Sequence, residues 1–85
     1  MKQEEVLEQL TQVATALRIK VKFENLNHLN RNQIGGGYIL RGQEHILVNS
    51  KSSLSEQIKT LISELKGRDL SSIYVKPLIR EMIER

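Results

Sequence analysis

The apolar residues near the start of the chain recur at steps of three and four positions from Val6 to Leu17. This spacing places them on one face of an α-helix. Glutamates enrich the first turns and Arg18 follows the last one, which suits the opposite charges at the two ends of a helix dipole. We therefore predict a first helix that Arg18 closes.

Apolar and charged residues then alternate between positions 19 and 24, as in a strand with one buried face and one face in water. The apolar positions are Ile19, Val21 and Phe23, and the charged ones are Lys20, Lys22 and Glu24. We expect the two lysines to point outward. Phe23 is expected in the core, as are Tyr38 and Tyr74, because all three aromatic residues have apolar neighbours.

A hairpin is predicted in the middle of the chain. Residues 25–33 are rich in asparagine and other polar residues, which indicates a loop. Three glycines, Gly35–Gly37, then precede short apolar runs at 38–40 and 45–48, with Gly42 between them. Two such runs around a glycine turn are typical of a β-hairpin.

Two further helices are predicted. Ser53 is followed three positions later by Glu56, which is the spacing of a capping box, and apolar residues recur at helical steps until Gly67 supplies a C-terminal cap. The second helix should therefore span 54–66. After an apolar extended run at 73–75, Pro77 suits the first turn of a last helix.

Together these elements predict an α+β fold in which residues 1–85 form one domain. Their order is helix, three-stranded antiparallel sheet, helix, short link and C-terminal helix, with the helices on one face of the sheet. The 85 residues contain no internal repeat and no linker that would separate two folding units.

Composition excludes several kinds of site. The chain has no cysteine, which excludes disulfides, thiolate metal sites and cysteine nucleophiles. No apolar stretch approaches the roughly 20 residues that cross a bilayer, so a cytoplasmic protein without a membrane partner is expected. The formal net charge of +3 is too small to identify a nucleic-acid partner.

Three features resemble functional motifs but lack their context. The glycines 35–37 lead into a strand, whereas phosphate-binding loops lead into a helix, so a close approach of two backbones is favoured. His28 and His45 form no helical pair with another metal ligand, and no serine lies in a nucleophile elbow. We therefore expect no metal, no cofactor and no enzymatic activity.

Four short segments carry a family resemblance: Gly36–Tyr38, Ile46–Asn49, Ser53–Gln57 and Thr60–Leu65. Together they resemble the zinc-peptidase domain of the ImmA and IrrE type, over roughly residues 7–70. In that family a helix and a three-stranded sheet precede a helix with an HExxH motif, whose histidines bind zinc and whose glutamate is the general base. The stretch from Gly36 to Asn49 is also similar to small bacterial proteins of this length.

Only the glutamate of that motif is present in this chain. Ser63, Glu64 and Gly67 stand at the three matching positions. The resemblance therefore implies a scaffold that lacks both helix-borne zinc ligands, and without a metal Glu64 has no water to activate.

The function that these observations favour is a non-catalytic protein-interaction or regulatory module that self-associates. Three amphipathic helices in so short a chain leave apolar surface for a second copy to cover. The expected interface is the apolar tail, with Ile73, Tyr74, Leu78, Ile79, Met82 and Ile83.

The alternative is an RNA-binding module, because helix, three strands, helix is also the order of the double-stranded RNA-binding domain. Its expected contacts are Lys20, Lys22, Arg41 and Lys51. Glu24 and Glu44 dilute this basic charge, and the second helix begins beside Lys51 alone rather than a lysine cluster.

Overall fold

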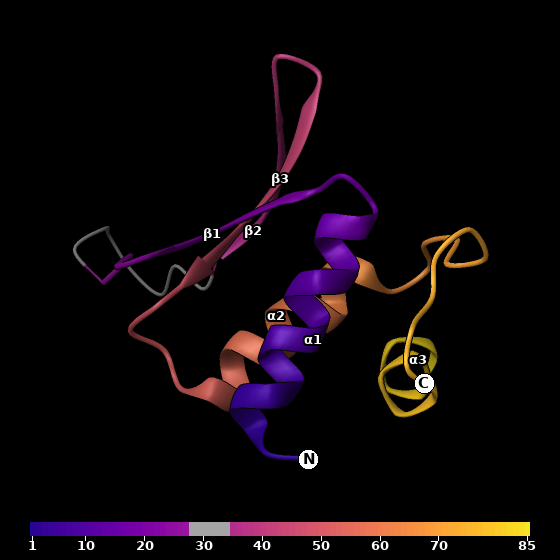
Figure 1. The fold of residues 1–85 in the computed structure, drawn as a ribbon. Coiled ribbons are helices and arrows are strands. Elements are labelled where there is room, and N and C mark those ends of the chain that lie inside the picture. The colour runs from indigo at the N-terminus through magenta and orange to yellow at the C-terminus, as the bar shows by residue number, and fades with distance from the viewer. Residues whose placement is uncertain (28–34) are drawn as a thin grey trace.

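The computed structural model describes residues 1–27 and 35–85, and these form an α+β fold. Their elements are α1 (Gln3–Ala16), β1 (Lys20–Glu24), β2 (Gly35–Leu40), β3 (Gln43–Asn49), α2 (Leu54–Leu65) and α3 (Pro77–Glu84). α1 and α2 lie side by side and contact the sheet, and α3 packs against both helices (Figure 1). The predicted succession of elements is confirmed.

The sheet is mixed, so the antiparallel arrangement expected from the sequence is wrong. β3 lies in the centre, β2 pairs with it in antiparallel fashion, and β1 pairs with it in parallel. The hairpin is as predicted, because Arg41 and Gly42 have φ values of 53° and 79°, which suit a two-residue type I′ turn. β1 runs parallel to β3 because β2, at the other edge, runs opposite to β1, and the hairpin returns β3 between them.

The second helix starts where the capping box predicted. The backbone N–H of Glu56 donates to Ser53 Oγ at 3.2 Å, and the N–H of Ser53 donates to Glu56 Oε1 at 3.3 Å. The helix ends at Leu65, and Gly67 beyond it has a φ of 83°. This left-handed conformation is the one that favours glycine after a helix.

The first helix ends earlier than predicted, and Arg18 lies outside it. The N–H groups of Arg18 and Ile19 donate to the carbonyls of Thr15 and Ala14, each at 2.9 Å. These two bonds form the Schellman arrangement that reverses a chain after a helix. Arg18 itself has a φ of 65°, so it occupies the left-handed position that glycine usually takes instead of contributing its charge to the last turn.

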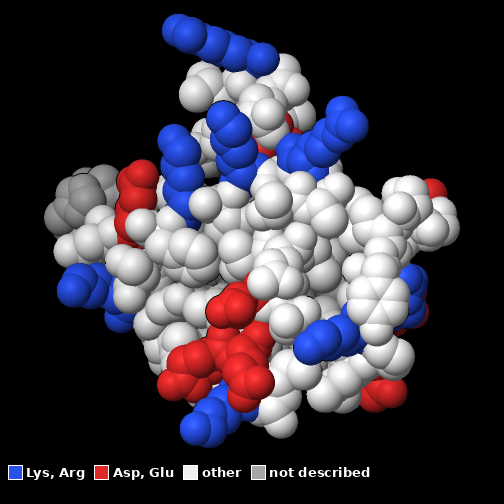
Figure 2. Space-filling model, viewed as in Figure 1, with Lys and Arg blue, Asp and Glu red and all other residues white. Residues whose placement is uncertain are grey.

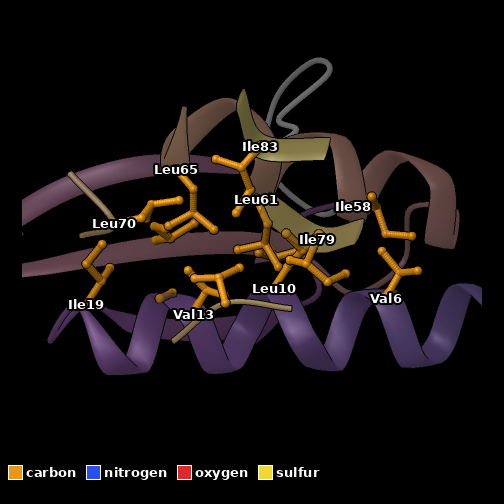
Figure 3. Packing of buried hydrophobic residues seen from close by; sticks show 14 residues of the cluster. Val6, Leu10, Val13, Ile19, Ile58, Leu61, Leu65, Leu70, Ile79 and Ile83 are labelled. Carbon is orange, nitrogen blue, oxygen red and sulfur yellow. The ribbon is translucent and has the colours of Figure 1, made fainter. Parts of the chain in front are cut away.

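The core lies between the sheet and the helices and continues beneath α3. The central strand contributes Ile46 and Val48, and the helices meet them with side chains that are almost completely buried (Figure 3). The main helical contributors are Leu10, Leu61, Leu65, Ile79 and Ile83. Fully burying one such side chain stabilises a fold by about 1.5–3 kcal/mol. No helix in the described part of the chain is long and apolar enough to span a membrane.

The aromatic residues are not in the core, which corrects the expectation from their apolar neighbours. Phe23 is 41% exposed, Tyr38 is 38% exposed and Tyr74 is 81% exposed. Phe23 lies on an edge strand, and Tyr38 lies on the face of the sheet that the helices leave uncovered. Tyr74 stands between half-buried Ile73 and buried Val75 in the link before α3.

Candidate functional site

The sheet has one face that the helices do not cover. Residues that pair across strands share a face, and successive residues alternate. Because Ile46 and Val48 face the helices, the uncovered face carries Lys20 and Lys22 from β1, Tyr38 and Leu40 from β2, and His45 and Leu47 from β3. Lys20 and Lys22 are exposed, as predicted.

The ring of His45 lies under the ring of Tyr38 on this face. The two ring centres are 4.9 Å apart and the planes differ by 6°. His45 Nδ1 also lies 3.0 Å from the carbonyl oxygen of Gln43, and the residue is only 5% exposed. These contacts give His45 a packing role, whereas His28 lies outside the described residues.

The two edge strands of the sheet differ in charge. β1 presents exposed Lys20, Lys22 and Glu24, and charged side chains on an edge discourage pairing with another strand. β2 has the sequence Gly-Gly-Gly-Tyr-Ile-Leu and carries no charge. Its Ile39 is 73% exposed and its Leu40 is 53% exposed. β2 therefore combines exposed apolar side chains with an edge that no other strand of the described residues covers.

The glycines of β2 allow very close approaches to other parts of the chain. A Cβ atom on Gly35 would lie 2.0 Å from the carbonyl oxygen of Leu47, so only glycine fits against β3 there. This confirms the predicted close approach of two backbones. A Cβ atom on Gly37 would lie 2.4 Å from Glu64 Oε1. The carboxylate of Glu64 thus lies directly against a strand that has no side chain at this point.

A cleft of about 340 Å³ lies where β2 approaches α2. Of the described residues, Gly35 and Gly36 line it from the strand. The helix contributes charged Glu56, Lys59 and Glu64, with Thr60 and Ser63, and Ser52 also lines it. One oxygen of Glu56 is occupied by the N–H of Ser53. Within residues 1–27 and 35–85, no group donates a hydrogen bond to the carboxylate of Glu64. Of the two cleft carboxylates, Glu64 is therefore the one without a hydrogen-bond donor among the described residues.

Arg68 holds the end of α2 in place beside the sheet. Its Nε donates to the backbone carbonyl of Glu64 at 2.7 Å, and its guanidinium also forms an ion pair with Glu44 of β3. The hydrogen bond from Arg68 holds the pKa of Glu44 below its ordinary value, and the positive charge of the guanidinium adds to this effect. Arg68 thus positions the segment that carries Glu64.

A second carboxyl group follows α2. Hydrogen bonds from the hydroxyl and the N–H of Ser71 lower the pKa of Asp69.

The positions that match the zinc-peptidase motif do not form a metal site. Ser63 and Glu64 line the cleft, while Gly67 lies beyond the end of the helix. In the described ranges no group of three or more His, Cys, Asp and Glu residues is arranged to hold a metal ion. A hydroxyl and one carboxylate do not match the ligands that zinc prefers, so zinc is not assigned to this cleft.

Comparisons of the chain with models of protein families, with curated proteins and with solved structures gave no match. The functional assignment therefore rests on the geometry of the sheet edge and the cleft.

The structure divides the apolar tail that the sequence nominated as an interface. Ile79 and Ile83 are 0% and 1% exposed, so they belong to the core of the chain itself and present nothing to a partner. Ile73 and Met82 are half-buried and pack against this core. Only Tyr74 and Leu78 remain exposed, because α3 folds back onto α1 and α2 with its apolar face inward.

The predicted nucleic-acid contacts do not form one patch. Lys20 and Lys22 lie on the uncovered face, Arg41 lies in the hairpin turn, and Lys51 follows the far end of β3. Figure 2 shows basic side chains along the upper part of the molecule, including the projecting end of the hairpin, and acidic side chains gathered lower on the same face. The exposed Ile39 and Leu40 were not identified as interface residues from the sequence. Nothing in the residues around them indicated that their strand lies at an edge of the sheet.

Proposed function

We propose that this chain is a non-catalytic protein-interaction module that associates with a second copy of itself through the free edge of β2. The observation that carries the proposal is the exposure of Ile39 and Leu40 on an edge strand without charge. Such an edge is a template for pairing with another strand, because its outward N–H and C=O groups have no partner within the sheet.

Two contributions favour association at this edge over the apolar tail. Strand pairing forms backbone hydrogen bonds and also removes apolar side chains from water, at about 25 cal/mol for each Å² buried. The tail supplies only the side chains of Tyr74 and Leu78, without a free backbone edge. The charged residues of β1 disfavour the opposite edge, so association through β2 gives a closed pair rather than a continuing sheet.

Sedimentation analysis over a range of concentrations tests the proposal. The wild-type chain should sediment as a dimer whose dissociation is visible on dilution. Ile39→Lys and Leu40→Lys should be monomers with unchanged circular dichroism spectra, because a charge is placed on the pairing edge. Leu78→Lys is the matched control on the exposed part of α3 and should remain a dimer. A wild-type monomer at several hundred micromolar, or a dimer in the two edge variants, would contradict the proposal.

RNA binding is the second candidate, and one observation favours it. Lys20 and Lys22 lie on the same uncovered face as the Tyr38–His45 stack, and basic groups beside an aromatic ring are the usual elements of single-strand binding. Binding of a fluorescent single-stranded RNA should then weaken steeply with salt and on changing both lysines to glutamate. Absence of binding at 50 mM salt would eliminate this candidate.

A further inference from the structure

Strand β2 consists of two unlike halves. Gly35–Gly37 has no side chains, whereas Tyr38–Leu40 has three large ones. An antiparallel pair of identical strands is related by a two-fold axis perpendicular to the sheet. This axis passes midway between the two copies of one residue, which therefore opposes itself. If that residue is Tyr38, Gly37 opposes Ile39 and Gly36 opposes Leu40. The bulky half of each strand then faces the glycine half of the other.

We infer that the second copy docks in this register and that its Arg41 enters the cleft to pair with Glu64. The inference rests on the proposed function and specifies the residues that recognise the second copy. With Tyr38 on the axis, Leu40 of the second copy opposes Gly36, and Arg41 follows it as the first residue of the hairpin turn, close to the glycines that line the cleft. The two-fold symmetry forms the same contact again on the other side.

The side chains fall on the correct sides of the sheet for this arrangement. Gly37 pairs with Ile46 within the chain, so residues that oppose Gly37 lie on the face toward the helices. Ile39 of the second copy therefore covers the strand where the carboxylate of Glu64 lies. Gly36 has no side chain to meet Leu40 of the second copy, and a Cβ atom added to it would lie 4.0 Å from Glu64 Oε2 in the cleft.

The charges of the cleft and of the hairpin turn are complementary. Neither the carboxylate of Glu64 nor the guanidinium of Arg41 has a hydrogen-bond or ion-pair partner in the parts of the chain that are described. Arg41 of the second copy begins the turn directly after Leu40, which opposes Gly36, so its long side chain starts close to the strand segment that Glu64 contacts. A guanidinium and a carboxylate form the strongest ionic hydrogen bonds available to side chains. Among the described residues of the lining, Glu56 and Glu64 are acidic and Lys59 is basic, which leaves one net negative charge there for Arg41.

Charge exchange between the two residues tests the pairing. Arg41→Glu and Glu64→Arg should each raise the dimer Kd by about tenfold or more, since each removes two symmetric contacts and opposes like charges. The double variant should return to within a few-fold of the wild-type Kd. Lys22→Glu is the control, because it makes the same change of charge on β1. Glu64→Gln tests the loss of the pair with a side chain of unchanged size.

Single-cysteine variants test the register, and the absence of native cysteine makes the result unambiguous. Tyr38→Cys should form a disulfide-linked dimer under mild oxidation, because its Cα atoms face each other within the 4.4–6.8 Å that a disulfide spans. Ile39→Cys and Tyr74→Cys should not. The inference is overturned if Arg41→Glu and Glu64→Gln leave the dimer Kd unchanged and Tyr38→Cys forms no disulfide-linked dimer. If Ile39→Lys still abolishes the dimer in that case, the proposed function stands. A monomeric wild type overturns both.

Discussion

Replacing glycine by alanine at four positions separates close backbone contact from conformational strain. Gly35 has a φ of 95° and would place its new methyl group 2.0 Å from the carbonyl oxygen of Leu47. Gly42 and Gly67 have φ values of 79° and 83°, but no atom of the other described residues lies within 4 Å of their added Cβ atoms. Gly37 is not in the left-handed region, and its methyl group would meet the end of the flexible Glu64 side chain at 2.4 Å.

These geometries give a clear order of effects on the free energy of unfolding. At Gly42 and Gly67 only the left-handed strain of about 1–2 kcal/mol applies, and a gain of about 0.4–1 kcal/mol from a stiffer unfolded chain partly offsets it. At Gly35 the same strain is joined by a collision with backbone, which must break hydrogen bonds worth about 0.5–1.5 kcal/mol each between β2 and β3. We expect a total loss of about 3 kcal/mol or more. Gly37→Ala should change stability by less than about 1 kcal/mol, because Glu64 can rotate away.

Urea unfolding followed by circular dichroism, at one fixed protein concentration, measures this series. Gly35→Ala should lower the midpoint most, and the small effect of Gly37→Ala should disappear when Glu64 is also changed to Ala. The reasoning fails if Gly35→Ala costs no more than Gly67→Ala. That result would mean that β2 does not lie against Leu47 in the register described.

Three other substitutions test the core, a buried hydrogen-bond centre and an ion pair. Ile79→Ala should lower the free energy of unfolding by about 2–5 kcal/mol, whereas Leu78→Ala on the exposed side of α3 should change it by less than about 0.5 kcal/mol in the same urea experiment. Asn49→Ala should lower the free energy of unfolding by about 1–3 kcal/mol, because Asn49 Oδ1 accepts from the N–H groups of Leu26 and Lys51 at 3.1 Å and 3.0 Å. Asn49→Asp keeps this acceptor and should therefore retain more stability in thermal melting. The lowered pKa of Glu44 means that its ion pair stabilises the fold above the ordinary value of 4.5 and that this contribution is lost as the pH falls through the folded-state pKa. Because the Glu44 side chain is 36% exposed, Glu44→Gln should reduce stability at pH 7 by less than about 1 kcal/mol and should have less effect at pH 3; an equal effect at both pH values would refute the role of the pair.

The sequence by itself determined the local elements, because each depends on residues a few positions apart. The capping box of Ser53 and Glu56, the hairpin turn before Gln43 and the apolar faces of the helices were all predicted by spacing alone. The sequence also singled out the glycine run and Glu64, but as two unrelated features. Nothing in their spacing indicated that the carboxylate lies against Gly37.

Only the tertiary structure decided which edge of the sheet each strand occupies and which apolar residues remain in water. Ile79 and Leu78 are adjacent and equally apolar, yet one is buried and the other is half exposed, because the direction in which α3 packs selects between them. Ile39 and Leu40 form an ordinary apolar strand in the sequence. They are exposed because they lie next to the hairpin turn, at the end of the hairpin that projects beyond the helices (Figure 1). A local pattern shows which face of an element is apolar, but covering that face depends on contacts between distant segments.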